Sequence, residues 1–91
     1  MEEETQPQLR VSVLIVSFDS APALRRCLAA LEASPDRESF EIIVVDNGSH
    51  DETREIQHEF ANVTFLRLPR NFGFTKALNI AMRTAKSELF L

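Results

Sequence analysis

The feature that most constrains the fold is an alternation of short β-branched runs with helical patterns, repeated three times along the chain. Largely apolar runs occupy residues 11–16, 41–45 and 63–68, and each has the length of a strand. A segment with apolar residues at helical spacing follows each run. Such alternation is typical of βαβ units, in which helices cover both faces of a parallel sheet. The sequence therefore predicts an α/β domain.

The first predicted helix begins at Ser20, a residue type suited to capping, and ends before residues 34–36. Its buried face consists of leucines spaced at i, i+4 and i+7: Leu24, Leu28 and Leu31. Cys27 falls among these leucines, so we expect a buried structural thiol rather than a reactive one. As the only cysteine, it also excludes a disulfide framework and a multi-cysteine zinc site.

Two further helices are predicted downstream. Ser49 and Glu52 have the spacing of a capping box, which would open the second helix, with Ile56 and Phe60 as its core contacts. The third helix begins at Phe74. Its predicted buried positions follow helical spacing: Phe74, Leu78, Ala81, Met82 and Ala85. Asn79 lies among them, and we expect its amide to bond a loop backbone.

Residues 88–91 begin a fourth strand, on which the chain ends. Right-handed crossovers and sequential pairing favour the strand order 3-2-1-4, which places this strand beside the first. Its exposed apolar residues predict pairing of two such edges in a homodimer. We interpret residues 1–9 as a flexible acidic leader and residues 10–91 as a truncated domain.

Composition limits the possible partners. The chain is 44% hydrophobic and 26% charged, as is usual for a globular protein, and its net charge of −4 disfavours nucleic acid as a partner. No apolar run approaches the roughly 18 residues of a membrane span, and the acidic start does not resemble a signal peptide. A cytoplasmic protein is expected.

Polar residues gather where the predicted strands end. The candidate binding residues are Ser17, Phe18 and Asp19 after the first strand, Asp46, Asn47, Gly48 and Ser49 after the second, and Asn71, Gly73 and Lys76 after the third. Ligands of open α/β sheets bind at this edge, and a helix N-terminus there can hold a phosphate. The alternative is that the acid and amide only tie a turn. Gly48 is expected to serve a turn with positive φ. The two histidines lack the spacing of a metal pair.

Taken in order, these corners resemble the motifs of family 2 glycosyltransferases of the GT-A fold. The family often reads V-S-(hydrophobic)3-(S/T)-(Y/F)-N at its first strand, where residues 11–20 read VSVLIVSFDS. Its second motif, V-V-D-(D/N)-G-S-x-D-x-(T/S), is similar to residues 44–53, and its third, N-x-G-(F/x)-x-x-A-x-N, to residues 71–79. Asp19 stands where Asn is usual, and Asn47 where many members carry Asp.

The resemblance implies a three-layer α/β/α, Rossmann-like GT-A half domain. It also implies that Ser17, Phe18 and the Asp46–Asn47 pair hold the base and ribose of a nucleoside diphosphate sugar, of the UDP or dTDP type. The amide oxygen of Asn47 would accept from a pyrimidine N3–H. The loop of residues 71–76 would lie near the site.

In this family a D-x-D element after the fourth strand carries the divalent metal, Mg²⁺ or Mn²⁺, and a later carboxylate is the base. Neither occurs in these 91 residues, so no catalytic or metal-binding residue is assigned and no tightly bound metal is expected. The resemblance thus implies the N-terminal part of an inverting glycosyltransferase, inactive by itself. The alternatives are a non-catalytic α/β nucleotide-binding module and a self-associating one.

Overall fold

The structure is a computed structural model that describes residues 11–87 and 89–91, so the predicted leader at residues 1–9 lies outside the described residues. The elements follow one another as β1 (Val11–Ser17), α1 (Ala21–Glu32), the 3₁₀ helix η1 (Arg37–Ser39), β2 (Phe40–Asp46), α2 (Thr53–Ile56), β3 (Thr64–Arg67) and α3 (Phe74–Thr84). The predicted alternation of strands and helices is confirmed.

The three strands form one parallel sheet in the order β1-β2-β3. Its register aligns the last residues of the strands, with Ser17 opposite Asp46 and Asp46 opposite Arg67. Because all three strands run the same way, their polar ends form a row along the carboxyl edge of the sheet. This row is the starting point of the candidate site.

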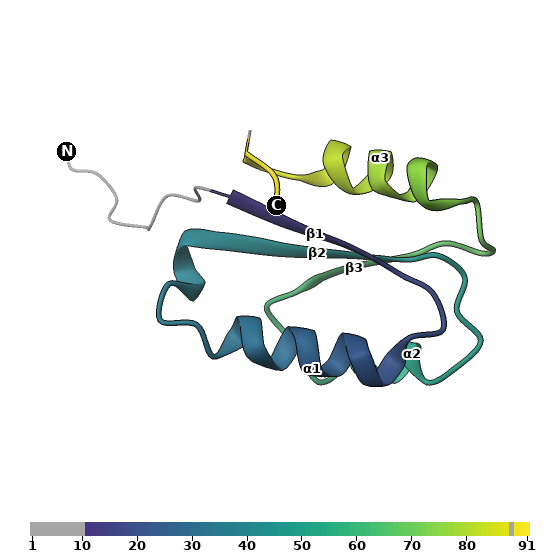
Figure 1. The fold of residues 1–91 in the computed structure, drawn as a ribbon, viewed down its shortest axis with the longest axis horizontal. Coiled ribbons are helices and arrows are strands. Elements are labelled where there is room, and N and C mark those ends of the chain that lie inside the picture. Colours follow the sequence, from purple (N-terminus) through teal and green to yellow (C-terminus); the bar gives the residue numbers. More distant parts are fainter. Residues whose placement is uncertain (1–10, 88) are drawn as a thin grey trace.

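Helices cover both faces of the sheet, with α1 and α2 on one face and α3 on the other (Figure 1). β2 is the central strand, and alternate residues feed the two layers: Ile42 and Val44 pack toward α1, whereas Ile43 and Val45 pack toward α3. All four are 1% exposed or less. The predicted three-layer α/β/α arrangement is confirmed, and the central strand is buried on both faces as its β-branched run indicated.

The fourth predicted strand is not formed as a strand. Residues 89–91 instead make an isolated parallel bridge, Ser12 to Phe90, on the side of β1 away from β2. The amides of Ser12 and Leu14 donate to the carbonyls of Leu89 and Leu91, both at 2.8 Å, and the Leu91 amide donates back to Ser12. The place predicted for the fourth strand is therefore correct, but only its beginning is paired.

The prediction of a buried Cys27 is wrong, because its side chain is exposed. Leu24 and Leu28 are buried as predicted, and Leu31 is partly buried. Cys27 lies on the flank of this leucine stripe, beside a hollow of about 200 Å³ that Ile15 and Ser17 of the open β1 edge also line. No described element covers that flank.

The buried face of α3 is rotated from the predicted one. Ala77 and Ala81 are fully buried against the sheet, whereas Phe74 is 64% and Met82 38% exposed. Small side chains let the helix approach the strands closely, and the larger ones are left at its flanks. Asn79 is exposed and makes no side-chain hydrogen bond within the described part of the chain, so its predicted bond to a loop is wrong.

Candidate functional site

Asp46, at the end of β2, is held on both of its carboxylate oxygens. One oxygen accepts the backbone N–H of Ser49 at 3.0 Å, and the other accepts Nη1 of Arg67 at 2.8 Å. A second guanidinium nitrogen of Arg67 donates to the Ser49 carbonyl at 3.1 Å. Arg67 thus closes the turn after β2 from the neighbouring strand. The side chain of Asp46 is only 4% exposed, so the ion pair compensates a buried charge.

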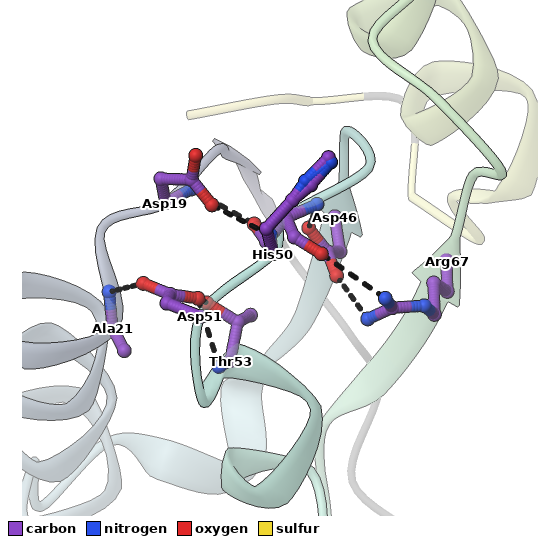
Figure 2. A network of polar contacts seen from close by, with 8 residues as sticks. Asp19, Ala21, Asp46, His50, Asp51, Thr53 and Arg67 are labelled. Carbon is purple, nitrogen blue, oxygen red and sulfur yellow. Dashed lines mark hydrogen bonds and ion pairs between the residues drawn. The ribbon is translucent and has the colours of Figure 1, made fainter.

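A reciprocal clamp joins the corners after β1 and β2. The Asp19 amide donates to the Ser49 hydroxyl oxygen at 2.8 Å, and the Asp19 carboxylate accepts the His50 amide at 2.7 Å. Figure 2 shows the Asp19 side chain reaching across to His50. Asp19 has φ +49°, a conformation that Asp and Asn tolerate better than other residues. The Asp found where the family usually has Asn therefore still suits this backbone.

Asp51 caps two helices at once (Figure 2). One oxygen accepts the amide and hydroxyl of Thr53 at the start of α2, and the other accepts the amide of Ala21 at the start of α1. The predicted capping box is wrong, because α2 begins at Thr53 and Ser49 bonds Asp19 instead. The Thr53 hydroxyl, together with the Thr53 and Ala21 amides, lowers the pKa of Asp51, although partial burial opposes this shift.

Ser20 occupies the predicted capping position of α1 but makes no capping bond with its side chain. Its hydroxyl donates to the Phe18 carbonyl instead. The cap that the sequence assigned to Ser20 is supplied from 30 residues away by Asp51. Local sequence located the start of the helix correctly and its capping group wrongly.

Asn47 fixes the loop after β3. Its amide nitrogen donates to the Asn71 side chain at 3.0 Å and to the Gly73 carbonyl at 3.3 Å, and its amide oxygen accepts the Phe72 N–H at 3.0 Å. Asn47 is 3% exposed. The oxygen that was expected to accept from a pyrimidine base therefore already accepts from the protein backbone.

The two glycines have different reasons to be glycine. Gly48 has φ +86°, and a Cβ there would lie 2.6 Å from backbone atoms of Arg70. Gly73 has φ +90°, but a Cβ there would meet nothing within 4 Å. The turn role predicted for Gly48 is confirmed, and a close backbone approach is added to it. Gly73 serves only the conformation that precedes α3.

The structure thus brings most of the candidate residues together, but they differ in how exposed they are and in how many of their polar groups are already hydrogen-bonded. Asp46, Asn47 and Ser49 are 3% exposed or less and bonded within the protein. The Phe18 ring is 42% exposed, and Ser17 is buried with a hydroxyl that has no hydrogen-bond partner. The remaining candidates are Asp19 and Gly48, described above, and Asn71, Gly73 and Lys76 of the third corner.

Lys76 lies apart from this network. Its ammonium nitrogen is 5.5 Å from the centre of the Phe72 ring, and it lines a hollow on the outer side of α3. Another hollow, of about 430 Å³, adjoins the corner itself and is lined by Gly48, Ser49, His50, Asp51, Arg54, Glu55, Arg67 and Pro69. Within residues 11–87 and 89–91, no three His, Cys, Asp or Glu side chains are grouped to hold a metal ion.

Sequence reasoning missed two residues that build the corner. Arg67 was assigned to the third strand, and its bond to Asp46 depends on the register between strands, which no local pattern reveals. Asp51 was not among the candidate residues of the corner. The Asp-x-Thr spacing of residues 51–53 is an Asx-turn signal and would have located the bond between Asp51 and Thr53.

Comparisons with known proteins agree with this arrangement. The family model described as Glycosyl transferase family 2 matches residues 12–91. The uncharacterized glycosyltransferase YfnE of Bacillus subtilis (strain 168) is 31% identical over 86 residues, covering 91% of this chain and 22% of that protein. The undecaprenyl-phosphate 4-deoxy-4-formamido-L-arabinose transferase of Aeromonas hydrophila is 31% identical over 88 residues, covering 89% and 27%.

A solved structure is similar as well. The mannosyltransferase PcManGT from Pyrobaculum calidifontis, in complex with GDP-Man and Mn²⁺, matches with a TM-score of 0.81 and 27% identity, over 91% of this chain and 26% of that one. The chain spans about a quarter of the length of these relatives. No helix in the described part of the chain has the length and apolar character to cross a membrane. With a matching family model and a GT-A neighbour, this chain belongs to glycosyltransferase family 2 and forms a Rossmann-like part of the GT-A fold.

Proposed function

We propose that this chain is the nucleotide-sugar-binding part of an inverting glycosyltransferase and that its corner holds the base of a UDP or dTDP sugar. The proposal is supported by the family, by the GDP-Man in the mannosyltransferase structure, and by the joining of three motif segments at one edge of the sheet. We place the protein in the cytoplasm, where such nucleotide sugars are used.

The observation that carries the proposal is the exposed ring of Phe18 at the end of β1, beside the corner where the three motif segments are joined. Within the described residues the Ser17 hydroxyl has no hydrogen-bond partner, but it is inaccessible to solvent and so does not face a ligand in this structure. The Ser17 side chain lines a largely apolar hollow of about 200 Å³. In our proposal the Phe18 ring stacks on the base, while Ser17 supports the corner from the end of β1.

The buried polar residues act indirectly in this proposal. Asp46, Asn47 and Ser49 hold the three corners together, and any contact that they make with base or ribose adds to bonds that they already make. Gly48 lets the loop at Arg70 approach, and Asn71 and Gly73 shape that loop. The corner is therefore rigid before the ligand arrives, which lowers the ordering cost of binding.

The described residues do not fit a divalent metal. Asp46 and Asp51 accept hydrogen bonds from N–H and O–H donors on both oxygens, and no third ligand stands beside them. We propose that the Mg²⁺ or Mn²⁺ of the whole enzyme, like its base, is held outside these residues. There the acceptor hydroxyl oxygen would bond to C1 of the sugar as the bond from C1 to the diphosphate breaks, and the base would take the hydroxyl proton.

An NMR titration of the 91-residue chain with UDP, dTDP and GDP tests the binding. We expect amide shifts at residues 17–19 and 46–49 without added Mg²⁺. Phe18→Ala should weaken binding by about fivefold or more, since stacking on a base contributes about 1–3 kcal/mol. Phe74→Ala, the same change at an exposed phenylalanine on α3, is the matched control. Absence of shifts at millimolar nucleotide, or equal effects of the two variants, would contradict the proposal.

Transfer activity tests the second part of the proposal. The 91-residue chain should move no sugar from a nucleotide donor to an acceptor in the presence of Mn²⁺. Turnover that persists when Asp46 and Asn47 are both replaced by alanine would overturn the assignment.

A second candidate function is self-association through the open β1 edge. Leu89 and Leu91 are 64% and 80% exposed, and they flank a backbone that pairs only at its start. Sedimentation equilibrium should then show a dimer that Leu91→Lys dissociates. A monomer at all accessible concentrations excludes this function and leaves the nucleotide proposal unaffected.

A further inference from the structure

At the amino end of the sheet, two side chains hold the backbone that leaves α3. Ser12 of β1 and Glu41 of β2 lie opposite each other in the strand register. The Ser12 hydroxyl donates to a carboxylate oxygen of Glu41 at 2.5 Å, and the N–H of Lys86 donates to the same oxygen at 2.5 Å. The Ser12 hydroxyl oxygen in turn accepts the Ser87 N–H at 3.2 Å. Side chains of two strands thus bind two consecutive amides beyond the helix.

Ser12 also pairs through its backbone with the segment that follows. Its N–H donates to the Leu89 carbonyl at 2.8 Å, and its carbonyl accepts the Leu91 N–H at 2.9 Å. The residue is fully buried, so each of its polar groups needs a partner within the protein. One residue therefore fixes both the turn at residues 86–87 and the pairing of residues 89–91.

Glu41 is the unexpected member of this arrangement. Apart from Asp46 at its end, it is the only polar residue in β2, which reads FEIIVVD. A carboxylate is favourable near the N-terminus of a helix and unfavourable near the C-terminus. Lys86 lies two positions after Thr84, the last residue of α3, so Glu41 gains nothing from the helix dipole. Its bonds indicate a role in the path of the chain rather than in helix capping.

The path of this segment matters because its direction leads to the corner. Residues 89–91 run parallel to β1, and hence toward the carboxyl edge of the sheet. A strand advances about 3.3 Å per residue, and successive side chains point to opposite faces. A slip of one residue would therefore shift the segment by about 3.3 Å and move every side chain to the other face. The register at Ser12 decides which face each side chain of this strand occupies.

We propose that Glu41 and Ser12 are positioning residues that set the register of residues 89–91 on β1. The two side chains bind the backbone just before this segment and so leave Phe90 opposite Ser12. Under the proposed function, the metal and the base are held outside the described residues, and this pair would help to position them without touching the substrate. That consequence rests on the proposed function, whereas the register does not.

Hydrogen exchange of backbone amides, followed by NMR in the 91-residue chain, tests the proposal. The Ser12 and Leu14 amides donate to residues 89–91 and should be protected from exchange. Glu41→Ala should speed their exchange by about tenfold or more, because hydrogen bonds to a charged group shift an equilibrium by about that factor. It should also weaken the nuclear Overhauser effect between Ser12 and Phe90. Glu38→Ala, the same change at an exposed glutamate of η1, is the matched control.

Two further variants separate positioning from a general loss of stability. Glu41→Gln keeps an oxygen that can accept both bonds, so it should lose less protection than Glu41→Ala. Ser12→Ala keeps the backbone bonds and is a milder test if Glu41→Ala does not fold. Combining Ser12→Ala with Glu41→Ala should add little to the larger single effect, because both changes remove the same bond.

Several outcomes would overturn the proposal. These are unprotected Ser12 and Leu14 amides in the unmodified chain, equal losses in Glu41→Gln and Glu41→Ala, fully additive losses in the double variant, or an effect of Glu38→Ala as large as that of Glu41→Ala. UDP should still shift the amides of residues 46–49 in Glu41→Ala. A failure of nucleotide binding in the unmodified chain would contradict the proposed function and leave the register result unaffected.

Discussion

The carboxyl end of β1 and its open side differ in which side chains are buried. At its carboxyl end, the polar residues Asp46, Asn47 and Ser49 are 3% exposed or less. Along its open side, the apolar residues of 89–91 are 43–80% exposed and are held by backbone hydrogen bonds to Ser12 and Leu14. Polar groups are buried where they have hydrogen-bond partners within the protein. Apolar groups stay exposed where no further described element packs against them.

This contrast changes how the motif residues should be interpreted. Side chains that a motif marks as ligand contacts are, in the corner, bonds between segments up to 31 positions apart. Under the proposed function, any variant that loosens the corner should also weaken its binding of the nucleotide. The variants below separate the corner from the open edge, beginning with the largest expected effect.

Gly48→Ala should be the most damaging change to the corner. The new Cβ would lie 2.6 Å from the backbone of Arg70 at a positive φ, so both clash and strain oppose it. We expect a loss of about 3 kcal/mol or more in the free energy of unfolding, measured by urea denaturation. Gly73→Ala has the same backbone strain without the clash, so its loss in the free energy of unfolding should be about 1–2 kcal/mol smaller than that of Gly48→Ala. Equal losses would show that the close approach of Arg70 is unimportant.

Arg67→Met tests the buried ion pair. The change would leave the Asp46 carboxylate, 4% exposed, with only the Ser49 amide as a partner. Because Arg67 itself is 36% exposed and water can replace part of it, we expect about 2 kcal/mol of lost stability. Arg54→Met, at an exposed residue of the same hollow, is the control. A loss no larger than that of the control would contradict the structural role of Arg67.

Thr53→Val should flatten the dependence of stability on acid. Hydrogen bonds led by the Thr53 hydroxyl lower the pKa of Asp51, so the folded protein binds this proton less readily than the unfolded chain. The stabilisation is full above the unfolded pKa of about 4 and is lost as pH falls through the lower folded value. At neutral pH the variant should lose about 1 kcal/mol.

Urea midpoints measured between neutral and acidic pH check this prediction. Thr75→Val, at an exposed threonine of α3, supplies the control for the loss of a hydroxyl. If both variants lose stability along the same pH profile, Asp51 is not the group responsible.

Leu89→Ser should have the smallest effect. Leu89 is 64% exposed, and the bond to Ser12 uses its backbone carbonyl, so the change should alter stability by less than about 0.5 kcal/mol. Its aggregation, followed by light scattering, should decrease. A loss of stability comparable with that of Arg67→Met would mean that the open edge is packed as firmly as the corner.

The fold was largely predictable because strands with β-branched runs and helices with leucine spacing are local patterns. The β1-β2-β3 order, the two helical layers and the place of residues 89–91 followed from them. The exposure of Cys27 and Phe74 did not, because it depends on which flank of a helix a neighbouring element covers. Helix spacing alone does not contain that information.

The site was predictable in position but not in detail. The sequence located the three corners, yet it could not show that Asn47 binds the loop at Asn71 or that Arg67 pairs with Asp46. Both bonds join segments more than 20 positions apart, and their partners are fixed by strand register and by the path of a loop. The capping groups were predicted wrongly for the same reason, because Asp51 caps α1, whose first residue lies 30 positions away in the sequence.

The clamp between Asp19 and His50 has a practical consequence for spectroscopy. Because the His50 amide donates to the carboxylate of the residue after Phe18, its proton resonance reports the position of the β1 corner. A molecule that touches only Phe18 will therefore perturb a signal 32 residues further along the sequence. The resonance of the His50 amide therefore reports on the β1 corner indirectly. A chemical-shift change at His50 is no proof that a ligand contacts His50.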